Sequence, residues 1–186
     1  MLTLDDDFEG AAASLDDVAV QNVSFGTATW RLGKNSGLSR NGSGAAVTDT
    51  HGAITTEYAE LSVGVKADMR VSAIVNSNGD SAIFARLQPD DTESGYQVRI
   101  TSSALILYRM DNGGATQLDS VAMTPTDGDT IEIECTGTTI IARGLDGGVP
   151  VETDPITDSD YATGYPGIRG FSTASGLKSF EAEVTL

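Results

Sequence analysis

Cysteine and histidine each occur once in the 186 residues, as Cys135 and His51. A single cysteine excludes a disulfide within the chain, and one cysteine with one histidine offers too few ligands for a zinc or other transition-metal site. Cys135 alternates with two isoleucines, which predicts a buried, unreactive thiol. His51 has Asp49 and Ser43 nearby in a Gly- and Ser-rich loop. A catalytic triad needs a specific geometry, so an ordinary loop histidine is expected.

Positive charge is also scarce, since 11 Lys and Arg stand against 27 Asp and Glu and the net charge is −16. Such a field repels nucleic-acid phosphates and disfavours an anionic membrane surface. No apolar run approaches the roughly 20 residues that a membrane span needs. We therefore expect no nucleic-acid partner and no membrane insertion. The opening Met-Leu-Thr-Leu-Asp-Asp-Asp lacks the regions of a signal peptide, so synthesis in a cytosol is expected.

Helical periodicity is nearly absent, and the best helical candidate, residues 11–20, is long enough for a turn or two at most. Elsewhere apolar and polar residues alternate, and Gly, Asn and Asp mark a turn every 8–12 residues. About ten to twelve short strands are expected, among them 66–76, 81–88, 96–100, 104–110, 115–123, 130–136, 138–143, 167–171 and 178–186. This pattern predicts an all-β fold, a two-sheet antiparallel β-sandwich or a barrel. The length suits a single domain over residues 1–186.

Several segments, in their order and spacing, resemble the concanavalin A-like lectin/glucanase superfamily, particularly its laminin-G-like branch. They are Asp-Asp-Phe-Glu-Gly at 6–10, residues 95–100 with 107–109, residues 128–133 with 137–140, residues 158–168, and Ser-Phe-Glu at 179–181. The resemblance implies a jelly roll of two packed antiparallel sheets in which the first and last strands are adjacent. It also raises two activities, sugar binding and glucan hydrolysis.

Glucan hydrolysis finds little support in the residues. The superfamily's glucanases carry Glu-x-Asp-x-x-Glu or a close variant on one strand, where one carboxylate attacks and another protonates the leaving group. Here Glu132 and Glu134 share a strand face, but the segment reads Ile-Glu-Ile-Glu-Cys-Thr-Gly and the third acid is missing. We expect these two glutamates to form a solvated outer row, and we do not expect an enzyme.

A sugar site requires aromatic faces beside planar hydrogen-bonding groups. The candidates for such a carbohydrate-binding site are Trp30, Tyr58, Arg86, Arg99 and Tyr108. Calcium is the one metal with candidate oxygen ligands, and these are Asp5, Asp7 and Glu181 close to the two termini. No other cofactor is expected.

The function that the sequence favours is a non-catalytic interaction module. The leading hypothesis is a bacteriophage virion protein, a capsid decoration, spike or tail-associated component on the virion surface. It would form a homo-oligomer and contact other structural proteins or a cell-surface glycan. The alternative is a free-standing, extracellular carbohydrate-binding module, and a glycoside hydrolase or lyase is a third possibility. The acidity, the lack of a signal peptide and the missing catalytic set favour the first hypothesis, while the low aromatic content of 6% disfavours a dedicated glycan binder.

Overall fold

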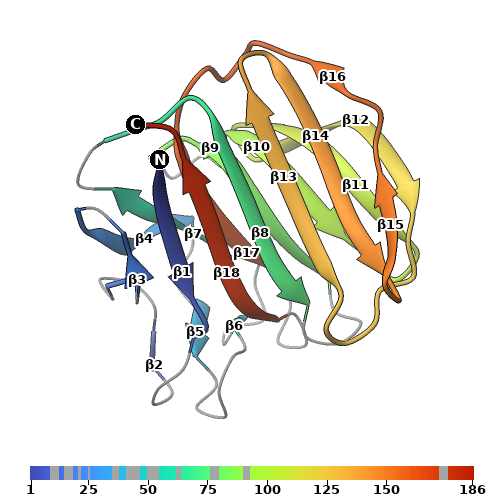
Figure 1. Ribbon diagram of the computed structural model, residues 1–186, viewed down its shortest axis with the longest axis horizontal. Coiled ribbons are helices and arrows are strands. Elements are labelled where there is room, and N and C mark those ends of the chain that lie inside the picture. The colour runs from blue at the N-terminus through green and yellow to red at the C-terminus, as the bar shows by residue number, and fades with distance from the viewer. Residues whose placement is uncertain are drawn as a thin grey trace.

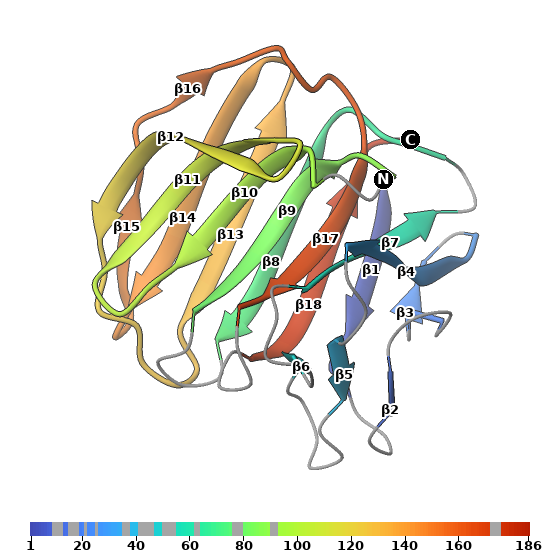
Figure 2. The same ribbon diagram turned by 180° about the vertical axis from the view of Figure 1, so that it is seen from behind.

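The computed structural model is a sandwich of two antiparallel sheets. It describes residues 1–8, 13–14, 19–20, 22–24, 26–34, 38–40, 47–49, 55–61, 64–75, 80–89, 93–171 and 176–186. The larger sheet faces the viewer in Figure 1, and the other faces the viewer in Figure 2. The predicted all-β, two-sheet architecture is confirmed.

The larger sheet has eight strands, and its two terminal strands are neighbours. Its main path is β15 (Val149–Glu152), β14 (Thr139–Asp146), β13 (Thr130–Thr136), β8 (Met69–Val75), β18 (Leu177–Val184), β1 (Leu2–Asp6) and β3 (Asn22–Val23), and β16 (Ile156–Thr157) also pairs with β14. Strand β1 pairs with β18 from Leu2↔Val184 to Asp6↔Phe180. The expectation that the first and last strands lie side by side is therefore confirmed, as Figure 1 shows.

The second sheet has seven strands and covers the other side of the core. Its order is β12 (Gly114–Ala122), β11 (Ala104–Asp111), β10 (Gly95–Ile100), β9 (Ser81–Leu87), β17 (Tyr165–Gly170), β7 (Thr55–Leu61) and β4 (Ala28–Lys34). A small third sheet consists of β2 (Ala13–Ser14), β5 (Leu38–Arg40) and β6 (Val47–Asp49).

The core lies between the two large sheets and follows the period-two pattern of the strands. In β13, Ile131, Ile133 and Cys135 are buried while the residues between them are partly exposed. The Cys135 thiol is fully buried, and burial raises its pKa to about 12. The predicted burial of the thiol is confirmed, and its low reactivity stays a prediction.

Strand positions were predicted more accurately than strand number. The expected strands at 81–88, 96–100, 104–110 and 130–136 match β9, β10, β11 and β13 to within one or two residues. The described residues form eighteen strands in place of the expected ten to twelve, because several are only two to four residues long. Leu186, the last residue of the expected strand 178–186, lies beyond β18 and is exposed. The residues that the structure describes include no helix long and apolar enough to cross a membrane.

Candidate functional site

The outer face of the seven-stranded sheet presents polar and aromatic side chains away from the core. Alternation directs Val98 and Ile100 of β10 inward and Gln97 and Arg99 outward. The strand registers then align outward positions of β11, β10, β9 and β17 in two rows: Tyr108, Gln97, Phe84 and Gly167 in one, and Ile106, Arg99, Ala82 and Arg169 in the other. We call this surface the seven-strand face; it is the side of the molecule turned to the viewer in Figure 2.

Three polar side chains of the seven-strand face hold buried nitrogen atoms that lack hydrogen-bond partners. These atoms are Nε2 of Gln97, Nε of Arg99 and Nε of Arg169. Gln97 is 1% exposed and Arg169 is 7% exposed. A buried donor that finds no acceptor costs about 1–3 kcal/mol, so such groups are rare in folded proteins and need an explanation.

The aromatic ring of Phe171 contacts both Arg99 and Arg169. The guanidinium carbon of Arg99 lies 4.2 Å from the centroid of the Phe171 ring, and that of Arg169 lies 4.6 Å from the same centroid. Cation–π contacts of this kind hold both guanidinium groups against one ring. The two cations, although they start two strands apart, therefore converge on one place.

Each arginine of this face also has a carboxylate partner. Arg99 donates from Nη2 to Oδ2 of Asp80 at 2.8 Å, and Nε of Arg169 lies 3.4 Å from Oε1 of the buried Glu93. Burial lowers the pKa of Arg169, Glu93 opposes that change and the nearby Arg99 adds to it. The carboxylates balance the two cations in number, but neither Nε–H group makes a hydrogen bond, although that of Arg169 lies in the ion pair with Glu93.

Two of the five predicted sugar-binding residues lie on the seven-strand face within the described structure. Arg99 is one, and Tyr108 is the other, packed against a small apolar cluster of Phe84, Leu87 and Met110. Tyr58 occupies an outer position by register, opposite Gly167, but its side chain lies outside the described residues. Among the residues that the prediction missed, Arg169 and Phe171 follow Gly167 at alternate positions, a period-two signal that could have found them.

Trp30 lies in the core and offers no face to a sugar, which corrects its prediction as a ligand platform. It is fully buried and its ring lies 5.0 Å from that of Phe180 and 6.0 Å from that of Phe8. Its Nε1 donates to Oδ2 of Asp6 at 2.9 Å, while Oδ1 of Asp6 accepts from the Phe8 amide at 2.8 Å. The Asp-Asp-Phe segment near the N-terminus therefore holds the Trp30 ring in position in the core.

Arg86 is likewise an internal residue, contrary to its prediction as a sugar-binding group. It is 1% exposed, and its guanidinium donates to the carbonyl oxygens of Ala67 at 2.6 Å, Tyr161 at 3.0 Å and Gly137 at 2.7 Å. Its φ angle of +53° breaks the alternation of β9, so Arg86 does not share a face with Phe84. Gly164 fits against this bulge, where a Cβ would lie 2.3 Å from the carbonyl carbon of Arg86.

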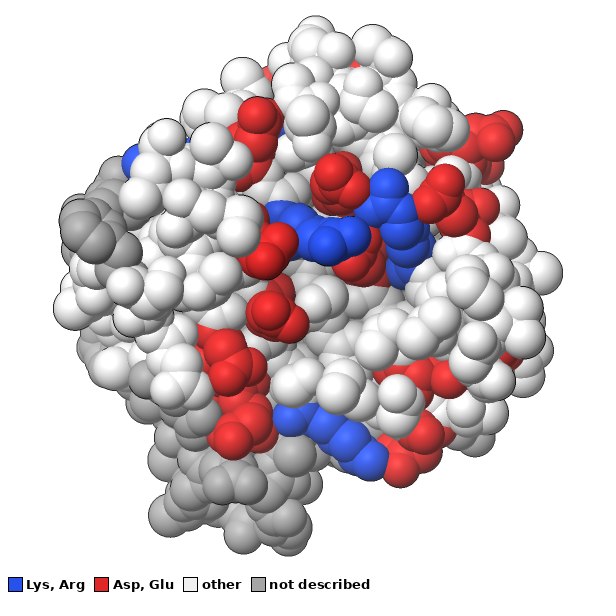
Figure 3. All heavy atoms as spheres, viewed as in Figure 1, with Lys and Arg blue, Asp and Glu red and all other residues white. Residues whose placement is uncertain are grey.

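The outer face of the eight-stranded sheet, which we call the eight-strand face, carries a different set of charges. Figure 3 shows basic and acidic side chains gathered in a depression across its middle. Three hollows of about 260, 260 and 120 Å³ meet there at Arg70. Arg143 contacts Glu132, Glu134 and Glu152, and Arg70 contacts Glu132 at 3.0 Å.

The predicted outer row of Glu132 and Glu134 is confirmed, and both carboxylates bind Arg143. The hydrogen bond from Arg143 lowers the pKa of Glu134, although burial opposes it. A glycosidase pair needs one carboxyl group whose pKa is raised so that it can donate a proton. The lowered pKa of Glu134 is the opposite of what a proton donor needs, so Glu134 does not fit that role.

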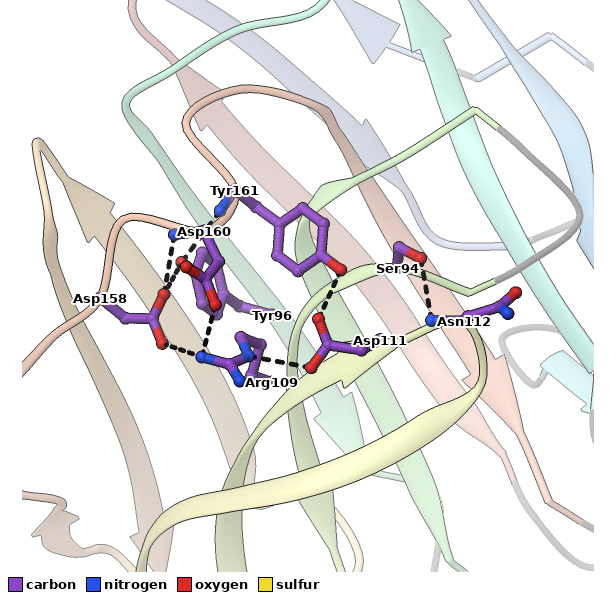
Figure 4. A network of polar contacts seen from close by, with 8 residues as sticks. All are labelled: Ser94, Tyr96, Arg109, Asp111, Asn112, Asp158, Asp160 and Tyr161. Atoms are coloured by element: carbon purple, nitrogen blue, oxygen red, sulfur yellow. Dashed lines mark hydrogen bonds and ion pairs between the residues drawn. The ribbon is translucent and has the colours of Figure 1, made fainter.

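A polar network closes the end of the seven-stranded sheet (Figure 4). Arg109 donates to Asp158 and Asp111, both at 2.9 Å, and lies 2.6 Å from Asp160. The Tyr96 hydroxyl donates to Asp158 at 2.6 Å, and that of Tyr161 donates to Asp111 at 2.7 Å. Burial would raise the pKa of Asp158, but the hydrogen bonds that it accepts lower it overall. The network fixes the segment after β16 onto the sheet.

The calcium candidates are only partly brought together. Asp5 is paired with Glu181 across β1 and β18, but its carboxylate accepts a hydrogen bond from Asn22 at 3.1 Å, and Asp7 follows the end of β1. In the described ranges, no three His, Cys, Asp or Glu side chains are grouped so as to hold a metal ion. Calcium at these residues stays a prediction. His51 and Ser43 lie outside the described residues.

Several solved structures are similar to this chain in fold. The carbohydrate-binding module CBM66 from Bacillus subtilis matches with a TM-score of 0.56 and 12% identity, over 94% of this chain and 98% of that one. The exoplasmic/lumenal domain of VIP36, in a Ca²⁺/Man-bound form, matches with a TM-score of 0.53 and 9% identity, over 84% and 83%. GH43B of a Bacteroides ovatus xyloglucan PUL matches with a TM-score of 0.53 and 13% identity, over 98% of this chain but 39% of that one.

These matches show a concanavalin A-like jelly-roll fold. No protein-family model and no curated protein sequence matches the chain.

Proposed function

We propose that this protein is a non-catalytic carbohydrate-binding module whose ligand docks on the seven-strand face. The observation that carries the proposal is the set of buried nitrogens of Gln97, Arg99 and Arg169 that make no hydrogen bond, together with the Phe171 ring against which the two arginines lie. Sugars offer many oxygen acceptors together with apolar C–H faces, so planar donors beside an aromatic ring match their chemistry. The fold agrees with this, because structures described as carbohydrate-binding or mannose-bound share it.

Hydrolysis is not part of the proposal. The acid pair that the sequence raised as a glucanase candidate, Glu132 and Glu134, lies on the opposite face, and both carboxylates are bound by Arg143. The match to GH43B covers 39% of that chain, so it carries the fold and no catalytic assignment. Three further expectations stay predictions: the virion role, the homo-oligomer, and the virion-surface or extracellular location. The similar structures support the carbohydrate-binding alternative.

The proposal is tested with a broad glycan array probed by the intact protein and two arginine variants. Arg99→Ala removes the most accessible donor of the seven-strand face, with 30% of its side chain exposed. Arg70→Ala is its matched control, because Arg70 is also a central-strand arginine paired with one carboxylate. Binding that Arg99→Ala weakens about tenfold or more, and that Arg70→Ala leaves unchanged, supports the proposal. An array without any bound glycan, or binding that only Arg70→Ala affects, contradicts it.

A further inference from the structure

The strands of the two large sheets differ in charge within one acidic protein. The strands of the seven-stranded sheet hold six basic residues, Arg31, Lys34, Arg86, Arg99, Arg109 and Arg169, against four acidic ones, Glu57, Glu60, Asp111 and Asp119. The strands of the eight-stranded sheet hold three basic residues, Arg70, Arg143 and Lys178, against eight acidic ones, Asp5, Asp6, Glu132, Glu134, Asp146, Glu152, Glu181 and Glu183. Loop carboxylates offset this difference, because Asp80, Glu93, Asp158 and Asp160 pair with arginines of the seven-stranded sheet. What distinguishes its arginines is therefore how their N–H groups are paired.

The arginines of the seven-strand face are short of acceptors. Arg99 and Arg169 each have one carboxylate partner, and each retains a buried Nε–H without a hydrogen bond. Both guanidinium groups lie against the Phe171 ring, within 4.6 Å of its centroid. An Nε–H can only donate, so a ligand that completes these two groups must bring acceptor oxygens close together.

Resting on the proposed function, we propose that the sugar bound at Arg99 and Arg169 is an acidic one that carries a carboxylate or a sulfate. A guanidinium presents its N–H groups in a planar fork that matches the oxygens of both anions. Neutral hydroxyls would supply donors as well as acceptors, and the arginine pair has no use for further donors. Asp80 and Glu93 already contact the two arginines, so the anion must share these cations with them. The more distant negative charge opposes the anion weakly, because salt screens charges beyond about 8 Å at physiological ionic strength.

The eight-strand face provides an internal control for simple attraction between arginine and anion. Arg143 already contacts three carboxylates there, and Arg70 contacts Glu132. No buried nitrogen of this face is left without a partner among the described residues. The affinity for an acidic sugar should therefore depend on Arg99 and not on Arg70.

Binding to two matched pairs of polymers tests the proposal. The first pair is polygalacturonate and its fully methyl-esterified form, and the second is dextran sulfate and dextran; the pairs distinguish a carboxylate from a sulfate. Wild type is compared with Arg99→Gln, with Arg99→Lys, which keeps the charge but loses the planar fork, and with Arg70→Gln. Thermal unfolding of each variant verifies that it is folded.

We expect the charged member of at least one pair to bind about tenfold more tightly than its neutral partner. Arg99→Gln should abolish this preference, Arg99→Lys should weaken it, and Arg70→Gln should leave it intact. Equal binding of charged and neutral polymers that still requires Arg99 would overturn the acidic-sugar proposal and leave the carbohydrate-binding function standing. Binding of an anionic polymer that Arg99→Gln does not change would also overturn it. If no polymer and no arrayed glycan binds, the proposed function itself fails.

Discussion

The two outer faces of this sandwich each display arginines, but they surround them differently. On the eight-strand face, Arg143 is ringed by three glutamates and no aromatic residue belongs to the cluster. On the seven-strand face, Arg99 and Arg169 stack on Phe171 and keep N–H groups without acceptors. The first arrangement is complete without a ligand, whereas the second leaves donors that the proposed ligand would satisfy. We therefore base the proposed binding face on the balance of donors and acceptors and not on local charge.

Arg86 extends the comparison to an arginine that is buried and fully paired. Replacing it with Leu leaves the carbonyls of Ala67, Gly137 and Tyr161 without their donor. Hydrogen bonds to a charged group contribute about 1.5–3 kcal/mol each, so we expect the free energy of unfolding to fall by about 3 kcal/mol or more. Urea denaturation measures this loss.

The matched control for Arg86→Leu is Arg70→Leu on the eight-strand face. Half of the Arg70 side chain is exposed, and exposed ion pairs contribute less than about 1 kcal/mol. Similar losses in the two variants would show that the three carbonyl bonds of Arg86 do not hold the loops at this end of the molecule.

Gln97 tests the claim that the seven-strand face gives up stability for binding. Replacing Gln97 with Leu removes a buried amide nitrogen that has no partner and adds apolar contact with Phe84. We expect the free energy of unfolding to rise by about 1 kcal/mol while sugar binding is lost. Chemical denaturation and the glycan array measure the two effects.

The control here is Gln117→Leu on the edge strand β12, where the amide donates to Ser120 at the surface. It should change neither quantity. A loss of stability in Gln97→Leu would mean that the amide of Gln97 already has a hydrogen-bond partner in the free protein. Gln97 would then give no support to the proposed ligand.

The pH dependence of stability should report on the eight-strand face. The hydrogen bond from Arg143 lowers the pKa of Glu134, so its contribution is fully present above the ordinary glutamate pKa of about 4.3 and disappears as the pH falls below it. The loss is modest because Glu134 is about one third exposed. Denaturation at successive pH values from 7 to 3 should show a shallower acid loss in Arg143→Gln than in the wild type.

Lys178→Gln removes one positive charge from the same sheet without touching Glu134, since Lys178 binds Asp127. It therefore controls for the change in net charge. If Arg143→Gln and the wild type lose stability in parallel between pH 5 and 3, Arg143 does not stabilise the ionised form of Glu134 on the eight-strand face.

The alternation of apolar and polar residues along the strands predicted much of the fold and part of the site. It placed Ile131, Ile133 and Cys135 in the core, and it placed Gln97 and Arg99 together on the outside. It failed at Arg86, because a positive φ angle turns that side chain and the sequence does not show where a bulge occurs. It also could not pair Ala82 with Arg169, since the register between strands so distant in the chain is set only by folding.

The segments that resemble the concanavalin A-like superfamily predicted the fold better than the ligand-binding residues. Asp6 and Asp158 lie in two of the segments that carried the resemblance, and both hold aromatic residues in place, Trp30 in one case and Tyr96 in the other. Such residues mark the fold rather than the ligand. The residues that we assign to the ligand, Arg169 and Phe171, follow the last of the longer segments by a few positions.

The smallest expected effect concerns Cys135, which lies on the inner side of β13 directly after the outward Glu134. The thiol is fully buried and burial raises its pKa to about 12, so almost no thiolate exists at pH 8. We expect a thiol reagent to leave the native protein unlabelled and to modify one group per chain after unfolding in urea. Labelling of the native protein at a rate close to that of the unfolded chain would show that β13 opens readily. In that case the eight-strand face would not be a finished, rigid surface, and its contrast with the seven-strand face would rest on the unpaired donors alone.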